Sequence, residues 1–166
     1  FDNVTKDEPR IIIPLRFEGR LIGYQGRSLV PKSKIKYITI MLEDDAPKVF
    51  GLDTINRENL VYVTEGPFDS YFIRNSIAMC GSDVDLRFMD CEFVYVYDNE
   101  PRNRQIVEKI TKTAEYGNKV VIWPKEIQEK DLNDMVLSGR EVQNLVESNI
   151  YSGLEAKLKL QNWKRV

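Results

Sequence analysis

Acidic side chains follow three apolar runs of the sequence, at residues 60–64, 93–97 and 120–123. These acids are Glu65, Asp98, Glu100, Asp131 and Asp134. Parallel strands end at one edge of a sheet, and α/β proteins bind their ligands there. Clustered carboxylates repel one another unless a cation neutralises them, and oxygen ligands of this kind suit Mg²⁺. The spacing therefore predicts a site for divalent cations.

Each acid taken alone is weaker evidence for such a site. The carboxylate of Glu65, before Gly66, is common in solvated turns, and Asp98 alone also fits an exposed loop. Three acidic clusters after three successive strand patterns are harder to attribute to surface composition. Asp69 has two interpretations of equal weight: a member of the acidic site, or a helix N-terminal residue that favours the helix dipole.

The charge of the chain is unevenly distributed, although its net value is only −2 over 166 residues. Residues 10–36 hold seven basic side chains and a single acid, Glu18, whereas residues 59–138 are net acidic. One part is therefore suited to an anionic polymer and the other to cations. The length predicts one domain, or one domain with a small appended lobe.

The residue types exclude several classes of chemistry. The chain has no histidine, which removes Ser-His and Cys-His nucleophile arrangements. Its two cysteines, Cys80 and Cys91, support neither a zinc site nor a disulfide framework and are expected to be free thiols. No apolar run reaches the roughly 18 residues of a membrane span, and no signal pattern opens the chain. We expect a cytoplasmic protein without membrane contact.

Two kinds of secondary-structure pattern divide the chain. Residues 11–30 predict a β-hairpin turning at Glu18 and Gly19, in which Gly23 and Gly26 indicate a bulge or the close approach of a ligand. A short strand at 36–40 and a loop at 43–47 follow. Beyond these lie predicted strands at 60–64, 77–80, 93–97 and 119–123, and predicted helices at 67–75, 103–116, 135–137 and 141–148, with a tail at 153–163 that is a last helix or a frayed end. Strands alternating with helices predict an α/β fold with a parallel sheet.

The acidic motifs occur in an order that resembles the Toprim domain of primases, topoisomerases and some nucleases. The resemblance runs over residues 59–138 and rests on Glu65-Gly66, on the acids at 98 and 100, and on the cluster at 130–134. The basic segment before it resembles the subdomain that precedes Toprim in DnaG-type primases of bacteria and phages. Residues 98–103 are most similar to primases of large tailed phages.

This resemblance implies a Rossmann-like, mainly parallel sheet flanked by helices, with a small N-terminal basic α/β lobe. The implied domains are 1–58 (basic subdomain), 59–138 (Toprim catalytic domain) and 139–166 (helical segment). The implied activity is template-directed synthesis of short RNA primers by nucleotidyl transfer during DNA replication. Its partners would be a single-stranded DNA template, ribonucleoside triphosphates, the RNA primer and, through regions outside this chain, a replicative helicase.

The resemblance also assigns roles to individual residues. The implied catalytic residues are Glu65, Asp98 and Glu100. Together with Asp131 and Asp134, these residues would hold Mg²⁺ or Mn²⁺, with more than one ion expected. The implied nucleic-acid or nucleotide contacts are Arg16, Arg20, Arg27, Lys34, Lys36, Tyr37 and Lys130.

The chain departs from the family pattern at one motif. The family usually has Asp-Gly-Asp, and this chain has Asn99 and Glu100 after Asp98. Glu100 is therefore a less secure ligand than Glu65. Two alternatives stay open: a Toprim nuclease that uses water as its nucleophile, and a non-catalytic nucleic-acid-binding Toprim module.

Overall fold

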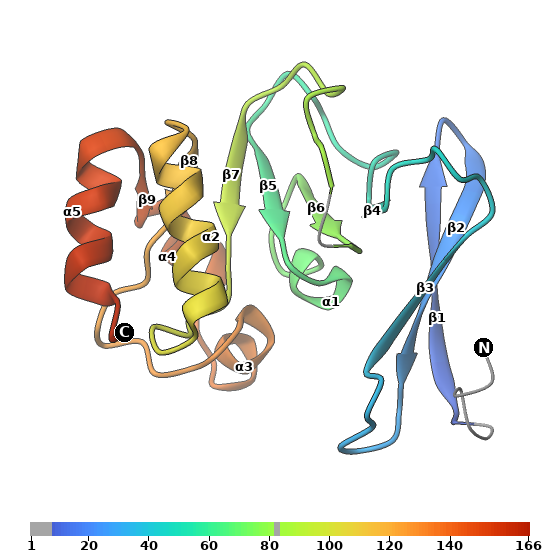
Figure 1. The fold of residues 1–166 in the computed structure, drawn as a ribbon, viewed down its shortest axis with the longest axis horizontal. Helices are drawn as coiled ribbons and strands as arrows, with labels where there is room; N and C mark the ends of the chain where they lie inside the picture. Colours follow the sequence, from blue (N-terminus) through green and yellow to red (C-terminus); the bar gives the residue numbers. More distant parts are fainter. Residues whose placement is uncertain (1–7, 82–83) are drawn as a thin grey trace.

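The computed structural model describes residues 8–81 and 84–166. These residues form a three-stranded sheet in the order β1-β2-β3 and a six-stranded sheet in the order β4-β6-β5-β7-β8-β9. Figure 1 shows the small sheet standing beside the β4 edge of the large one. The two sheets correspond to the basic and acidic halves of the sequence.

The small sheet is antiparallel, and its strands are β1 (Arg10–Phe17), β2 (Arg20–Ser28) and β3 (Tyr37–Met41). Its hairpin turn lies at Glu18 and Gly19, as predicted, and the Asp53 carboxylate accepts their N–H groups at 2.8 and 2.9 Å. Residues 8–50 contain no helix, so the helices of the α/β fold belong to the part of the chain that forms the large sheet.

The glycines of β2 lie close to groups of the neighbouring strands. The register of the hairpin shifts beside Gly23, where Ile22 is the extra residue of β2, so the predicted bulge is confirmed. A Cβ at Gly23 would lie 2.7 Å from the carbonyl oxygen of Ile40 in β3. A Cβ at Gly26 would lie 3.3 Å from the Arg10 side chain. The close approach at these positions is therefore that of adjacent protein groups.

The large sheet has four parallel strands at its centre, and the predicted mainly parallel α/β sheet is confirmed. These strands are β6 (Ser76–Met79), β5 (Val61–Thr64), β7 (Phe93–Val96) and β8 (Lys119–Val121). Every residue of β5 is buried, which is typical of a strand covered on both faces. The antiparallel edge strands β4 (Val49–Phe50) and β9 (Ile150–Tyr151) escape prediction because two residues form no pattern. Strand β4 precedes residue 58 in the sequence and pairs with β6 in this sheet.

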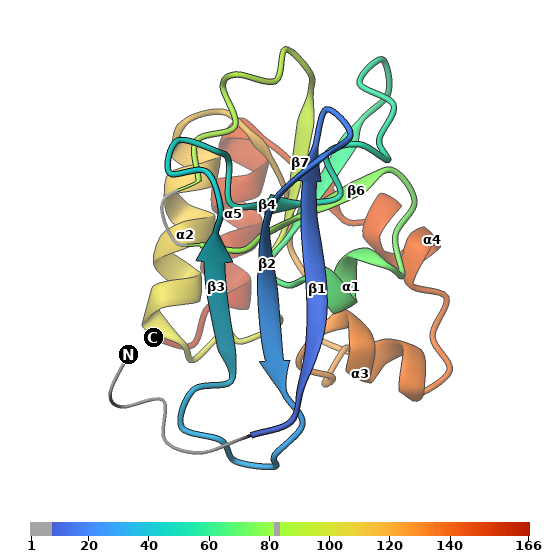
Figure 2. The ribbon, with the colours of Figure 1, turned by 90° about the vertical axis from the view of Figure 1, so that its right-hand side faces the viewer.

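Helices cover both faces of the large sheet, as Figure 2 shows, with α2 and α5 on one side and α1 and α4 on the other. They are α1 (Pro67–Ser70), α2 (Arg104–Glu115), α3 (Leu132–Leu137), α4 (Val142–Glu147) and α5 (Gly153–Trp163). The Asn103 side chain caps α2 by accepting from the N–H of Gln105 at 3.1 Å, and Gly117, at φ 76°, follows its end. Helix α1 ends at Ser70 and is shorter than predicted; turns follow it, and Asn75, at φ 53°, immediately precedes β6. None of the described helices is long and apolar enough to cross a membrane.

Candidate functional site

The acids that follow the central strands meet at one edge of the large sheet. Strands β5 and β7 pair in parallel with Thr64 opposite Val96, so Glu65 and Asp98 emerge side by side. The backbone N–H of Asp98 points at Glu65 Oε2, 3.4 Å away. In Figure 1 this end of β5 and β7 lies next to α1 and α3.

Four carboxylates from this edge influence one another electrostatically, and we call Glu65, Asp69, Asp98 and Asp131 the acid cluster. Burial raises the pKa of Asp98 to about 7, and the charges of Glu65 and Asp69 add to the rise. Burial and the charge of Asp131 raise the pKa of Asp69 to about 6. Asp69 thus lies in the acidic site, where its Oδ1 accepts the N–H of Asn133 at 3.2 Å.

Two lysines neutralise part of this charge. Lys109, from α2, forms an ion pair with Glu65. Lys130 lies between two acids, with Nζ 3.7 Å from Asp98 Oδ2 and 3.8 Å from Glu100 Oε2. The sequence motifs include Lys130 but not Lys109. The apolar pattern of α2 predicts which face of the helix is buried, but it does not predict that Lys109 reaches Glu65 after β5.

The predicted ligands do not all converge. Asp131 caps α3, and its Oδ1 accepts the N–H of Asp134 at 2.8 Å. The Asp134 side chain itself is exposed. Glu100 lies at the rim, 32% exposed, where it accepts from Asn103 Nδ2 at 3.4 Å. Of the predicted set, only Glu65, Asp98 and Asp131 therefore belong to the acid cluster.

The described residues contain no group of three or more His, Cys, Asp or Glu side chains arranged to hold a metal ion. Lys109 and Lys130 give the physical reason, because each pairs with a carboxylate that would otherwise face a cation. The donor set still suits a hard divalent ion, since it consists of carboxylate oxygens. Asp98, with a pKa of about 7, lacks full compensation of its charge, which a divalent ion would provide.

Part of the basic lobe faces the acid cluster. The guanidinium of Arg27 lies 4.5 Å from the ring centre of Phe68 in α1 and 5.6 Å from that of Tyr37. Burial raises the pKa of Tyr37, and the charges of Asp69 and Asp131 act in the same direction. Arg27 and Lys36 in turn lower the pKa of Asp69 against the effect of burial. A pocket of about 610 Å³ joins both lobes here and is lined by Arg27, Lys36, Phe68 and Asn133, among others.

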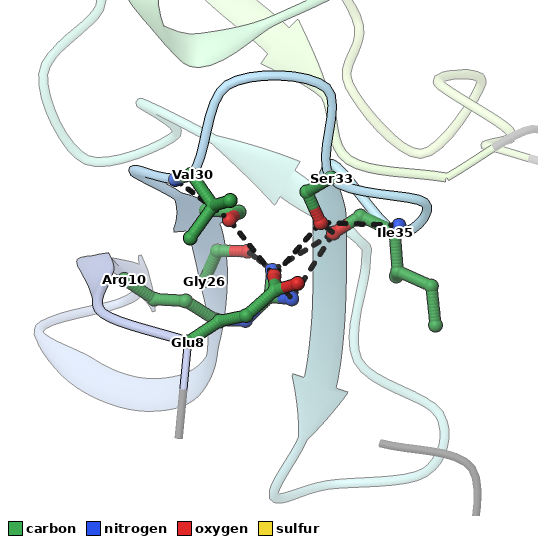
Figure 3. A network of polar contacts seen from close by, with 7 residues as sticks. Glu8, Arg10, Gly26, Val30, Ser33 and Ile35 are labelled. Carbon is green, nitrogen blue, oxygen red and sulfur yellow. Dashed lines mark hydrogen bonds and ion pairs between the residues drawn. The ribbon is translucent and has the colours of Figure 1, made fainter. Parts of the chain in front are cut away.

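A hydrogen-bond network fixes the loop that carries Lys36, as Figure 3 shows. Glu8 Oε2 accepts from Ser33 Oγ at 2.7 Å and from Arg10 Nη2 at 2.9 Å. Arg10 also donates to the carbonyl oxygen of Ile35 at 3.1 Å. The guanidinium of Arg10 thus binds groups within the lobe, and its role is to hold the loop in place.

The remaining predicted basic residues lie elsewhere. Arg16 and Arg20 flank the turn at the opposite end of the hairpin, and Arg20 forms an ion pair with Glu43 at 2.6 Å. Arg27 lies seven steps along the strand from Arg20, which is about 23 Å at a rise of about 3.3 Å per residue. Lys34 is exposed on the loop after β2. The structure therefore brings Arg27, Lys36 and Tyr37 to the acid cluster but not these three.

Asn99, at the position where the family usually has glycine, joins three segments. Its Nδ2 donates to the carbonyl oxygens of Ile127 and Glu129, both at 3.0 Å. Its Oδ1 accepts the indole N–H of Trp163, in α5, at 3.0 Å. The departure from the family motif thus places a structural hub directly after Asp98, and no local sequence signal identifies it.

The DNA primase of Enterobacteria phage T4 is 36% identical over 168 residues, covering 96% of this chain and 48% of that protein. This chain thus spans about half the length of that relative. No family model matches the chain.

Solved structures of bacterial primases have the same fold. The Aquifex aeolicus primase, with zinc-binding and RNA polymerase domains, is 25% identical with a TM-score of 0.61, over 84% of this chain and 40% of that one. The RNA polymerase domain of Mycobacterium tuberculosis primase DnaG, solved with a double-stranded DNA oligomer bearing a 6-nucleotide overhang, has a TM-score of 0.67 over 89% of this chain and 55% of that one. At 19% identity, this second likeness shows the fold alone.

Proposed function

We propose that this chain belongs to the DNA primase family, that it has a DnaG-type core, and that it is the part that synthesises RNA primers. The observation that carries the proposal is the 36% identity to a phage DNA primase across 96% of this chain. The placement of a basic lobe opposite a carboxylate cluster supports it. Residues 59–138 would be the Toprim catalytic domain, 1–58 the basic subdomain and 139–166 a helical segment.

The proposed reaction is template-directed nucleotidyl transfer. The 3′-hydroxyl of a growing primer attacks the α-phosphate of a ribonucleoside triphosphate, and pyrophosphate leaves. Because the triphosphate is anionic, it needs positive charge around it and a precise position relative to the hydroxyl. No protein nucleophile takes part, which agrees with a chain that has no histidine.

The residues of the site have separate roles in this proposal. Glu65 and Asp98 would hold Mg²⁺ or Mn²⁺, with Glu100, Asp131 and Asp134 as the further predicted ligands. When bound, the metal would neutralise charge that develops on the phosphate. Arg27 and Lys36 would contact the template strand or the nucleotide from the side of the basic lobe, with Tyr37 between them and the acid cluster.

The partners are proposals as well. The DNA bound to the related mycobacterial domain supports a nucleic-acid ligand for this chain. A single-stranded template, ribonucleoside triphosphates and the RNA primer follow from the proposed reaction. A replicative helicase would bind through regions outside this chain, and the setting would be the cytoplasm of a bacterial host if a phage encodes the protein.

Primer synthesis on a single-stranded DNA template tests the proposal. We expect this chain to incorporate labelled ribonucleotides in the presence of Mg²⁺ or Mn²⁺. We expect Glu65→Gln and Asp98→Asn to abolish incorporation, because each removes a carboxylate charge at nearly constant size. Asp44→Asn, at an exposed acid of the β3–β4 loop, is the matched control and should retain activity.

The same reaction mixture separates the alternatives. Cleavage of the template without incorporation would identify a Toprim nuclease. DNA binding with neither incorporation nor cleavage would identify a non-catalytic module. Normal incorporation by both Glu65→Gln and Asp98→Asn would refute the assignment of the acid cluster.

A further inference from the structure

Lys130, which contacts Asp98 of the acid cluster, also lines a second cavity. Its volume is about 690 Å³, within the range of roughly 300–1,000 Å³ typical of small-molecule sites. Its walls are the segment after β7, the loop after β8 and the end of the chain beyond α5. We call it the C-terminal pocket.

The C-terminal pocket is lined by an excess of positive charge. Arg102, Lys125 and Arg165 line it, and none of them forms an ion pair with the described residues. The one acid in its lining is Glu100, which Lys130 faces at 3.8 Å. Three uncompensated cations around one cavity are notable in a chain whose net charge is −2.

The walls of the pocket are fixed to one another. Asn99 ties the loop after β8 to Trp163, as described above. The backbone N–H of Arg165 donates to the carbonyl oxygen of Pro101 at 2.8 Å. The 12-residue helix α2 also begins at this rim, and its first turn carries no acid, so the positive end of its dipole adds to the field.

We propose that the C-terminal pocket binds the triphosphate group of a nucleotide. Lys130 would link this group to the acid cluster, because it contacts both Asp98 and Glu100. Cations that approach from three separate segments suit a compact polyanion with several oxygens. The inference deepens the proposed function and rests on it for the identity of the nucleotide.

The lining favours a nucleotide over a nucleic-acid strand. Single strands are bound along grooves in which exposed aromatic rings stack on the bases. The one aromatic side chain of the pocket, Trp163, is 5% exposed and its indole N–H is already bonded to Asn99. The pocket therefore offers charge without a stacking surface.

Calorimetric titration of the chain with ATP and with inorganic tripolyphosphate, both in excess EDTA, tests the inference. We expect wild type to bind both compounds. Lys125→Ala/Arg165→Ala should bind both at least about tenfold more weakly, which is the effect of one charge-assisted hydrogen bond. Arg57→Ala/Lys157→Ala, two exposed basic residues outside the pocket, should bind like wild type. All four replaced side chains are exposed, so equal melting temperatures would verify the fold.

Three results would overturn the inference. The first is no binding of either compound by wild type, and the second is unchanged binding by Lys125→Ala/Arg165→Ala. The third is a Lys125→Ala/Arg165→Ala variant that binds ATP like wild type but binds a single-stranded oligothymidylate more weakly. That result would assign the pocket to a nucleic-acid strand. Because EDTA and the absence of a template remove the proposed reaction, primer synthesis can succeed or fail independently of this result.

Discussion

The buried charge of Asp98 should lower the stability of the fold by a measurable amount. Its carboxyl has a pKa of about 7 in the folded chain against an ordinary value of 3.8, mainly because it is buried. Between these two values the folded state binds more protons than the unfolded state, so the free energy of unfolding falls as the pH rises. Above about pH 7 the whole penalty is present, and below about pH 3.8 it is absent.

The size of the penalty follows from the same two values. A rise from 3.8 to about 7 corresponds to about 4 kcal/mol at about 1.4 kcal/mol per pKa unit. The Asp98 side chain is 22% exposed, and solvent reduces part of this penalty. We therefore expect Asp98→Asn to raise the free energy of unfolding by about 2 kcal/mol. Asparagine keeps the size of the side chain and removes its charge.

Urea denaturation in EDTA, at about pH 4 and about pH 8, measures this gain. Asp98→Asn should be more stable than wild type at the higher pH and nearly equal to it at the lower pH. Asp44→Asn should change stability by less than about 0.5 kcal/mol at both, as expected for an exposed position. A destabilised Asp98→Asn at neutral pH, or a difference independent of pH, would contradict the reasoning.

Three further predictions concern the metal, the basic lobe and the hub. Mg²⁺ or Mn²⁺ should stabilise wild type by about 2.7 kcal/mol at a hundredfold excess over Kd, and in a thermal melt this effect should shrink in Glu65→Gln; an unchanged wild-type melt would argue for solvated surface acids. Binding of single-stranded DNA should weaken with salt by about −0.7 in log–log slope per phosphate neutralised, and Arg27→Ala/Lys36→Ala should flatten that slope in a fluorescence titration. If that variant keeps the parental slope but cannot use nucleotides, both residues belong to the nucleotide site. Asn99→Gly restores the usual family residue but should lower the free energy of unfolding by about 2–4 kcal/mol in urea denaturation. The indole N–H of Trp163 and two backbone carbonyls lose their partner, and glycine adds backbone freedom. Equal stability would show that Asn99 does not join these segments.

Local patterns of apolar residues predict most of the strands and helices of this fold. The apolar runs ending at Thr64 and Tyr97 predict adjacent buried strands, because a strand covered on both faces must be apolar throughout. The alternation of strands with helices then requires parallel pairing, which puts Glu65 and Asp98 at one edge. The two-residue strands and the early end of α1 escaped prediction, since they depend on pairing and turns that only the folded chain supplies.

The tertiary structure determines which side chains make up the site. The sequence left Asp69 between two interpretations, and the structure fits both: it lies in the first turn of α1, and the packing of α1 against α3 brings it to the acid cluster. The same folding turns Asp134 outward and carries Arg16 and Arg20 to the far end of the hairpin. Sequence spacing determines which residues follow a strand, because chain connectivity alone enforces that order. Which side chains then meet depends on the relative positions of separate loops and lobes, and contacts such as Lys109 with Glu65 or Asn99 with Trp163 join residues far apart in the chain.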